Sequence, residues 1–273
     1  MVLSRLFRAG AAEGRPSRGA SRARTGAGPL AILALAATLI APLAPWTTPA
    51  LASSCAEVTA VTRADTLPRL PAAGGFRVLA IGSSSTFGTG ASAPSLTYPA
   101  RLEALLRARI AREDVVVVNA GIPGETADAT LDRFARLLAQ ERFDLAIWQV
   151  GTNDALRGVA PDEFAARLER GVALARDGRV PLLVVDPQYF PGIPDRVAYE
   201  RTVRLVGDLA EARGVAVLRR YDVMRAWADR SEAHLASMLS GDRFHMGDAG
   251  YACLADLIAD ALVGADGRTA FAE

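Results

Sequence analysis

The chain contains no lysine, so every cationic side chain in its 273 residues, apart from two histidines, is an arginine. This absence excludes a lysine nucleophile and a P-loop, whose lysine binds nucleotide phosphates. Histidine is almost as scarce, and His234 and His245 do not have the His-x-x-x-His spacing of zinc hydrolases. The Gly-x-Ser-x-Gly turn of α/β-hydrolases is missing as well. The sequence gives no sign of a bound metal or cofactor.

Positive charge is unevenly distributed. The net charge is +1, but residues 1–52 contain a single acid, Glu13, and six arginines: Arg5, Arg8, Arg15, Arg18, Arg22 and Arg24. The rest of the chain is slightly acidic, which gives no reason to expect a nucleic-acid partner. An apolar run from Leu30 to Leu43 follows the arginines and precedes Ala50-Leu51-Ala52, an Ala-x-Ala cleavage pattern.

We therefore predict that residues 1–52 are an export signal and that the mature protein is periplasmic or extracellular. The apolar run is short for a membrane-spanning helix and contains Pro42. An uncleaved membrane anchor remains the alternative. Membrane contact is expected only through this segment or through a lipid attached to Cys55.

Cysteine occurs only twice, at Cys55 and Cys253. An even pair in an exported protein suggests a disulfide, here between the N-terminal arm and the last helix. Leu51-Ala-Ser-Ser-Cys55 also resembles a degraded lipobox, so lipidation of Cys55 is a second interpretation. A third is that Cys55 is free and Cys253 is simply buried.

Short apolar runs alternate with amphipathic segments after residues 53–75, which we expect to form an irregular arm. The runs are Arg77–Gly82, Val115–Asn119, Leu145–Val150, Val180–Asp186 and Val215–Leu218. The amphipathic segments are Tyr98–Ala111, Ala127–Gln140, Pro161–Asp177, Arg196–Arg213 and Gly247–Val263. Continuous apolar runs suit strands buried on both faces, and the segments between them are long enough for crossover helices. Residues 76–273 are thus predicted to be one three-layer α/β/α domain with a five-stranded parallel sheet.

Polar residues follow several of these strands, at the point where each strand ends. They are Gly82-Ser-Ser-Ser-Thr86, Asn119–Thr126 and Gly151-Thr-Asn-Asp154, and Asp242 and His245 precede the final helix. The carboxyl ends of parallel strands share one edge of the sheet, so these loops should converge. Acyl transfer needs a hydroxyl nucleophile, a base oriented by a carboxylate, and donors for the developing oxyanion. The set supplies each of these groups.

This combination resembles the SGNH hydrolase superfamily, also called GDSL-type esterases and lipases, over nearly all of residues 77–262. The family's first block reads Gly-Asp-Ser, and here Gly82-Ser83-Ser84 matches it with Ser83 in place of the usual Asp. The resemblance implies a flavodoxin-like fold, with Ser84 as the nucleophile. It also implies that Asp242 and His245 are the carboxylate and the base of a catalytic triad.

The resemblance further implies an oxyanion hole made by the backbone N–H groups of Ser84 and Gly124 and the side-chain amide of Asn153. The implied activity is hydrolysis of carboxylic esters, with lysophospholipids, thioesters or acetylated polysaccharides as candidate substrates and no cofactor. A non-catalytic envelope or carbohydrate-binding protein on the same fold is the alternative function.

Three further sequence features have two interpretations each. The loop after the fourth strand places Gln188, Tyr189 and Phe190 near the expected cleft, where they would bind substrate or pack the loop against the domain. Gly88-Thr-Gly90-Ala-Ser-Ala93 has the form of a dinucleotide-binding turn, but it lies well past the first strand, so we interpret it as chance. His234 is interpreted as a surface residue.

Overall fold

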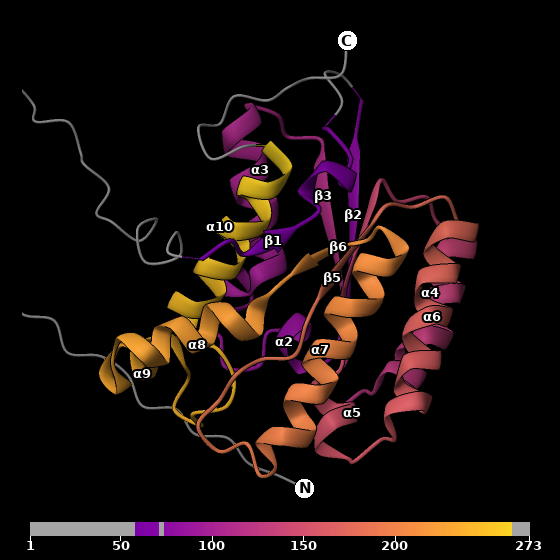
Figure 1. Cartoon of the computed structure of the whole chain (residues 1–273). Coiled ribbons are helices and arrows are strands. Elements are labelled where there is room, and N and C mark those ends of the chain that lie inside the picture. Colours follow the sequence, from indigo (N-terminus) through magenta and orange to yellow (C-terminus); the bar gives the residue numbers. More distant parts are fainter. Residues whose placement is uncertain (1–57, 71–73, 264–273) are drawn as a thin grey trace, which may run out of the picture. The chain divides into compact units, whose positions relative to one another are not determined.

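The computed structural model describes residues 58–70 and 74–263, all of which belong to a compact unit of residues 48–273 (Figure 1). The predicted export signal and Cys55 lie outside the described residues. Cys253 is buried in the last helix, and its predicted disulfide with Cys55 stays a prediction. Among the described helices, none combines the length and the apolar character needed to cross a membrane.

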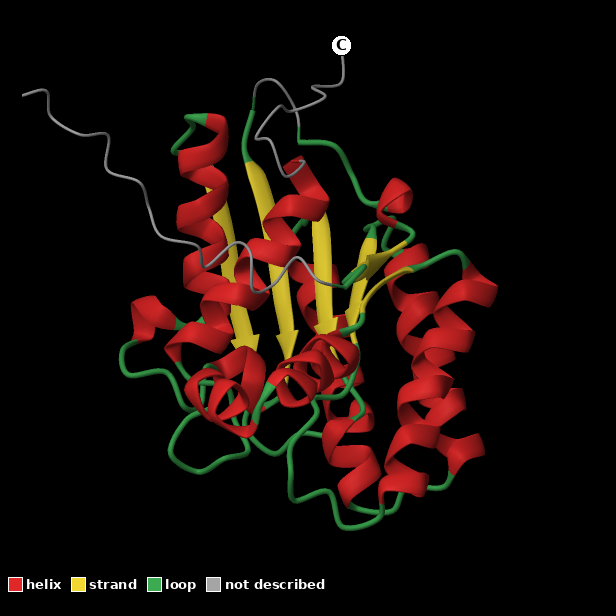
Figure 2. Ribbon diagram, turned by 60° about the vertical axis from the view of Figure 1, so that its left-hand side comes forward, coloured by secondary structure: helices red, strands yellow, loops and turns green. Residues whose placement is uncertain are grey.

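The sheet formed by the described residues has six strands. Figure 2 shows its strands side by side. Their order is β1-β6-β5-β4-β2-β3. The bounds are β1 (Val61–Thr62), β2 (Phe76–Gly82), β3 (Val115–Gly121), β4 (Leu145–Gln149), β5 (Leu182–Val185) and β6 (Ala216–Leu218). Strands β2 to β6 are parallel, as predicted. The predicted number of five is wrong, because β1 adds an antiparallel edge strand beside β6.

Strand β1 belongs to the arm that we expected to be irregular. It pairs Val61 with Leu218 and Thr62 with Val217, and Arg219 donates its N–H to the carbonyl of Ala60 at 2.7 Å. Two residues are too few to show the alternation by which a strand is recognised in a sequence. The pairing therefore depends on the neighbouring edge, which the arm covers.

Helices cover both faces of the sheet and confirm the three-layer prediction (Figure 1). One face is covered by α3 (Tyr98–Ile110), α8 (Arg220–Arg230) and α10 (Asp248–Val263), and the other by α4 (Ala127–Gln140), α6 (Pro161–Asp177) and α7 (Arg196–Arg213). Successive side chains of β2 alternate between the two cores: Val78 and Ala80 join one, whereas Leu79 and Ile81 join the other. Both faces of β2 are thus buried from Val78 to Ile81, which explains why this part of the strand is continuously apolar.

Of the described helices, α8 and the short ones were not predicted. They are α2 (Ser84–Phe87), α5 (Thr152–Leu156), α9 (Glu232–Met238) and α8, together with 3-10 turns at Ala64–Thr66 and Pro94–Leu96. Helices α2 and α5 directly follow the carboxyl ends of β2 and β4. They carry residues of the candidate site and hold its loops in place.

Candidate active site

Ser84 lies at the carboxyl edge of the sheet, directly after β2, the strand next to the edge strand β3. Strand β2, which leads into it, pairs with β3 on one side and with β4 on the other. The loop after β3 carries Gly124, and the loop after β4 carries Asn153. The strand order alone therefore places the predicted nucleophile between the two predicted oxyanion loops.

Helix α2 packs very closely against the end of β3. A Cβ atom added to Gly121 would lie 2.1 Å from the backbone nitrogen of Phe87, closer than real contacts allow. Only glycine permits this approach, because it has no side chain to push the helix away. The short helix, and with it Ser84, is thus fixed against the sheet by the absence of a side chain at residue 121.

The structure brings the predicted nucleophile, base and carboxylate together. His245 Nε2 lies 2.9 Å from Ser84 Oγ, and His245 Nδ1 lies 2.6 Å from Asp242 Oδ2. Ser84 and His245 are only partly buried, so a ligand can reach both. These three side chains form one line of hydrogen bonds, in which Nδ1–H donates to the carboxylate and Nε2 is left to accept from the hydroxyl.

Asp242 is held as an anion by its own loop. Partial burial favours the neutral acid, but hydrogen bonds from the Ser240 hydroxyl, the His245 ring and the N–H groups of Phe244 and His245 outweigh it and lower the pKa of the carboxyl. Each of these donors stabilises the charged form. A carboxylate that stays ionised can orient the imidazole and stabilise its protonated form.

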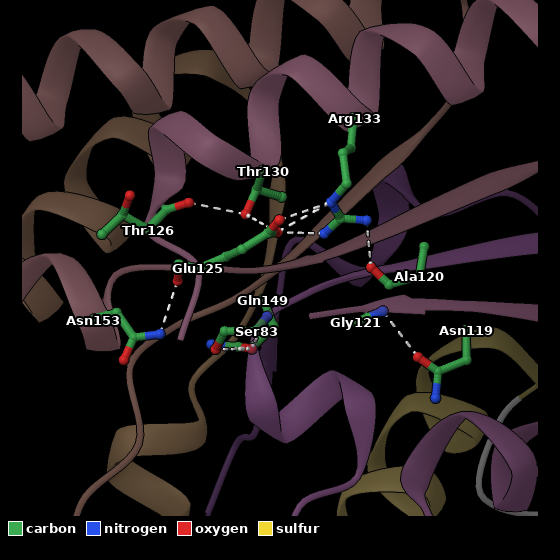
Figure 3. A network of polar contacts seen from close by, with 10 residues as sticks. All are labelled: Ser83, Asn119, Ala120, Gly121, Glu125, Thr126, Thr130, Arg133, Gln149 and Asn153. Carbon is green, nitrogen blue, oxygen red and sulfur yellow. Dashed lines mark hydrogen bonds and ion pairs between the residues drawn. The ribbon is translucent and has the colours of Figure 1, made fainter. Parts of the chain in front are cut away.

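Ser83, which replaces the Asp of the family motif, is hydrogen-bonded to an uncharged side chain, that of Gln149. Its backbone N–H and its hydroxyl both donate to Oε1 of Gln149 at 2.9 Å, and both residues are buried (Figure 3). A carboxylate at residue 83 would face this acceptor oxygen without a proton to donate. The serine is therefore matched to Gln149, and the turn before the nucleophile keeps a hydrogen-bonded anchor.

Two of the three predicted oxyanion donors, Gly124 and Asn153, are neighbours of a single residue, Glu125. Asn153 donates from Nδ2 to the backbone carbonyl of Glu125 at 2.8 Å, and Gly124 precedes Glu125 in the chain (Figure 3). Gly124 is exposed and has φ +81°, a conformation that favours glycine. Its carbonyl accepts a 2.7 Å hydrogen bond from Arg157. The loop after β3 is thus joined to α5 and to Arg157.

Gln188, Tyr189 and Phe190 are buried, so the structure favours packing over the predicted substrate contact. Gln188 is 1% exposed; its Oε1 accepts from Ser85 Oγ at 2.9 Å, and its Nε2 donates to the Phe244 carbonyl at 2.8 Å. Ser85 and Phe244 are the chain neighbours of Ser84 and His245. Gln188 therefore links the segments of the nucleophile and the base.

Tyr189 and Phe190 also pack against the protein. Phe190 packs edge-on against Phe244 with ring centroids 4.7 Å apart, and Phe244 packs edge-on against His245 at 4.6 Å. Tyr189 packs against Tyr221 at 5.6 Å. Aromatic pairs in this geometry fix side-chain orientation. The loop after β5 thus contacts Phe244, which in turn packs against the His245 ring.

Asp154, next to Asn153 in α5, has structural partners. Asp154 accepts from the N–H of Ala127 at 3.0 Å and from Arg167, so it caps the start of α4, and burial raises the pKa of its carboxyl. His234 lies half-buried in α9. Among the described residues, no cluster of three or more His, Cys, Asp or Glu side chains could hold a metal ion.

Sequence reasoning missed two residues of the site, Glu125 and Arg133. The Glu125 carboxylate accepts from Arg133 Nε at 3.0 and 3.1 Å, and Arg133 Nη1 donates to the Ala120 carbonyl at 2.8 Å. Acidic and basic residues eight positions apart give no helical spacing signal, because Glu125 precedes the helix that carries Arg133.

A partly exposed serine, a histidine and an aspartate bonded in series at the carboxyl edge of a parallel sheet define a site of the nucleophile–base–carboxylate class. The model of the Non-GDSL lipase-like family matches residues 54–267. The chain therefore belongs to this family, and its resemblance to the SGNH hydrolases is confirmed.

Individual relatives are similar over shorter segments. "Esterase TesA" of Pseudomonas aeruginosa is 35% identical over 117 residues, which are 42% of this chain and 58% of that protein. "Arylesterase" of Vibrio mimicus is 37% identical over 65 residues, 24% of this chain and 32% of that protein. The match thus spans less than two thirds of either relative. A crystal structure of TesA has a TM-score of 0.56 at 27% identity, covering 68% of this chain and 97% of that one.

Proposed function

We propose that this protein is a serine-dependent hydrolase of carboxylic esters, with Ser84 as the nucleophile, His245 as the base and Asp242 as the orienting carboxylate. The observation that carries the proposal is the continuous line of hydrogen bonds from Ser84 Oγ through the imidazole to Asp242. Relatives named esterase and arylesterase support it. No cofactor is needed for this chemistry.

The mechanism follows from the direction of these hydrogen bonds. His245 Nε2 takes the proton of Ser84 as the hydroxyl oxygen attacks the ester carbonyl carbon, which forms a tetrahedral intermediate. The protonated imidazole then donates to the leaving alcohol, and the acyl group stays on Ser84. A water molecule, deprotonated by the same nitrogen, releases the carboxylic acid and regenerates the serine.

The negative charge of the tetrahedral intermediate needs donors beside Ser84. We assign this role to the N–H groups of Ser84 and Gly124 and to the Asn153 side chain. As the first residue of α2, Ser84 has no partner for its N–H within the helix. The Asn153 amide uses one N–H on Glu125 and has a second to offer. Removing one such donor typically costs about 10²–10³ in turnover.

The rim of the site favours esters with an apolar acyl or aryl group. Phe87, Ile122 and Leu156 are three of the four large apolar side chains that are exposed among the described residues. They lie on α2, on the loop before Gly124 and on α5, that is, on the three segments that carry the proposed oxyanion donors. Clustered exposed apolar side chains mark a contact surface. Lysophospholipids and apolar thioesters fit this rim, whereas it offers little to an acetylated polysaccharide.

The test is hydrolysis of p-nitrophenyl esters from acetate to palmitate by the wild type and by Ser84→Ala, with fluorophosphonate labelling of both. We expect activity and labelling in the wild type, loss of both in the variant, and an optimum at an acyl chain longer than acetate. A wild type with no Ser84-dependent turnover or labelling would favour the alternative, a non-catalytic envelope or carbohydrate-binding protein. An optimum at acetate would remove the apolar-acyl assignment alone.

We also propose that the protein is exported, with residues 1–52 as its signal. The basic segment, the apolar run and Ala50-Leu51-Ala52 support this. N-terminal sequencing of the mature protein checks it: a start near Ser53 is expected, whereas a protein that keeps Met1 would favour an uncleaved anchor.

A further inference from the structure

One guanidinium group holds both ends of the loop that carries Gly124. Arg133, in α4, donates from Nη1 to the Ala120 carbonyl at 2.8 Å, just before the loop begins (Figure 3). Its Nε donates to both carboxylate oxygens of Glu125, just after Gly124, and its Nη2 bonds the same carboxylate. The path between residues 120 and 125 is therefore closed by a single side chain.

Glu125 passes this constraint on to the Asn153 side chain. The Glu125 carbonyl accepts one N–H of the Asn153 amide at 2.8 Å. An amide group is planar, so fixing one N–H fixes the direction of the other. The orientation of the second N–H, the one available to a ligand, thus depends on where the Glu125 backbone lies.

The Glu125 carboxylate is well enclosed. Its side chain is 14% exposed and that of Arg133 is 15% exposed. The hydroxyl of Thr130 donates to the Thr126 carbonyl at 2.9 Å and also lies 3.3 Å from the same carboxylate. A multiply bonded pair shielded from water has one geometry, whereas exposed pairs exchange between several.

The protein contains a matched pair on its surface. Arg213, in α7, donates from Nε at 2.9 Å and Nη2 at 2.5 Å to the two carboxylate oxygens of Glu169, in α6. These side chains are 49% and 41% exposed, and they join two helices away from the loops of the site. Both pairs join an arginine to a glutamate. The pair of Glu125 and Arg133 is well enclosed and connects the loop after β3 to α4, whereas the pair of Glu169 and Arg213 is exposed and connects α6 to α7.

We propose that Glu125 and Arg133 are positioning residues that orient the Asn153 amide for the oxyanion. The proposal rests on the proposed ester hydrolysis. Neither residue touches the reacting atoms; the ion pair fixes the Glu125 backbone, and the Glu125 carbonyl fixes the amide. The pair therefore acts on the transition state, in which the oxyanion forms, more than on the bound ester.

The test compares Arg133→Lys with Arg213→Lys, using the best p-nitrophenyl ester of the wild type. A lysine keeps the charge but loses the planar guanidinium group, whose Nε and Nη2 bond the Glu125 carboxylate while Nη1 bonds the Ala120 carbonyl. We expect kcat to fall about 10- to 100-fold in Arg133→Lys with KM changed less than about threefold, because a donor is misplaced and not removed. Arg213→Lys should match the wild type.

A double-mutant cycle with Asn153→Ala separates positioning from general support of the fold. If Arg133 acts through the Asn153 amide, Arg133→Lys should cost almost nothing further once that amide is absent. A trifluoromethyl ketone, which forms a tetrahedral adduct with a serine, should also lose affinity in parallel with kcat. Glu125→Gln, which keeps the side-chain shape, should show the same pattern if Arg133→Lys is poorly folded in thermal unfolding.

The outcomes are distinct. Wild-type turnover in Arg133→Lys, or an equal loss in the presence and absence of the Asn153 amide, would overturn the positioning role. A wild type without Ser84-dependent hydrolysis or labelling would instead overturn the proposed function on which it rests.

Discussion

The two halves of the candidate site are held in different ways. On the base side, the Asp242 carboxylate receives its hydrogen bonds from Ser240, Phe244 and His245, all within three residues of it in the chain. On the oxyanion side, Gly124 lies in the loop after β3 and Asn153 in α5, and the two are joined through Glu125. Arg133 of α4 and Arg157, directly after α5, complete the contacts. The first half is a local turn, and the second depends on long-range contacts.

The turn from Asp242 to His245 contains a residue in an unfavourable backbone conformation. Arg243, between Asp242 and His245, adopts φ +56°, which is uncommon for a residue with a side chain. Such a conformation costs about 1–2 kcal/mol and persists only where the surroundings fix it. The hydrogen bonds to Asp242 supply that constraint. We therefore expect that, on the base side, only substitutions within the turn reduce activity, and that they reduce it strongly. On the oxyanion side, substitutions at residues farther from the site should also reduce activity.

The largest effect in this comparison is expected from Asp242→Asn. The amide NH₂ cannot accept the Nδ1–H of His245, so the ring is driven to the tautomer whose Nε2 carries the proton and cannot act as a base. We expect kcat/KM for p-nitrophenyl esters to fall about 10³–10⁴-fold. Asp128→Asn, at an exposed carboxylate paired with Arg170 on the surface, is the control and should keep full activity.

The difference in stability between the wild type and Asp242→Asn should depend on pH. The pKa of Asp242 is lower in the folded protein than in the unfolded chain, so its ionisation stabilises the fold above about pH 4, the ordinary carboxyl value, and this contribution fades as the pH falls below it. Urea midpoints of the wild type and Asp242→Asn should therefore differ most at neutral pH and converge in acid. A constant difference across the range would show that Asp242 does not titrate in this way.

The base side is also the half that the sequence made predictable. Asp242 and His245 are three residues apart next to a helix start, so their proximity follows from local spacing, and Ser84 follows from the end of a strongly apolar strand. Helix α8 could have been found as well, because Tyr221, Met224 and Trp227 recur at helical spacing and are all buried.

Two other features of the site could not be predicted, because both depend on tertiary contacts. On the oxyanion side, the pairing of Glu125 with Arg133 depends on where α4 lies against β3. Between the nucleophile and the base, the burial of Gln188 depends on the path of the loop after β5. In the sequence, Gln188, Tyr189 and Phe190 are polar and aromatic residues in a loop, a pattern that binding loops and packed loops share. Only the tertiary contacts of Ser85, Phe244 and Tyr199 distinguish the two.

Gln188 joins the nucleophile segment to the base loop, and its replacement should give the smallest effect of the series. Gln188→Met fills the same volume but leaves the Ser85 hydroxyl and the Phe244 carbonyl without a partner in the interior. Each unsatisfied group costs about 1–3 kcal/mol, so the melting temperature should fall. Ser84 and His245 also contact each other directly, so we expect kcat to fall less than about tenfold.

The control for this variant is Gln140→Met, at an exposed residue at the end of α4, which should change neither stability nor turnover. A substrate-binding residue would behave in the opposite way: Gln188→Met would raise KM and leave the melting temperature unchanged, because the lost contacts would be with the ester and not with the protein. That result would restore the interpretation suggested by the sequence. It would also mean that, in solution, Gln188 faces the cleft and does not depend on its contacts with Ser85 and Phe244.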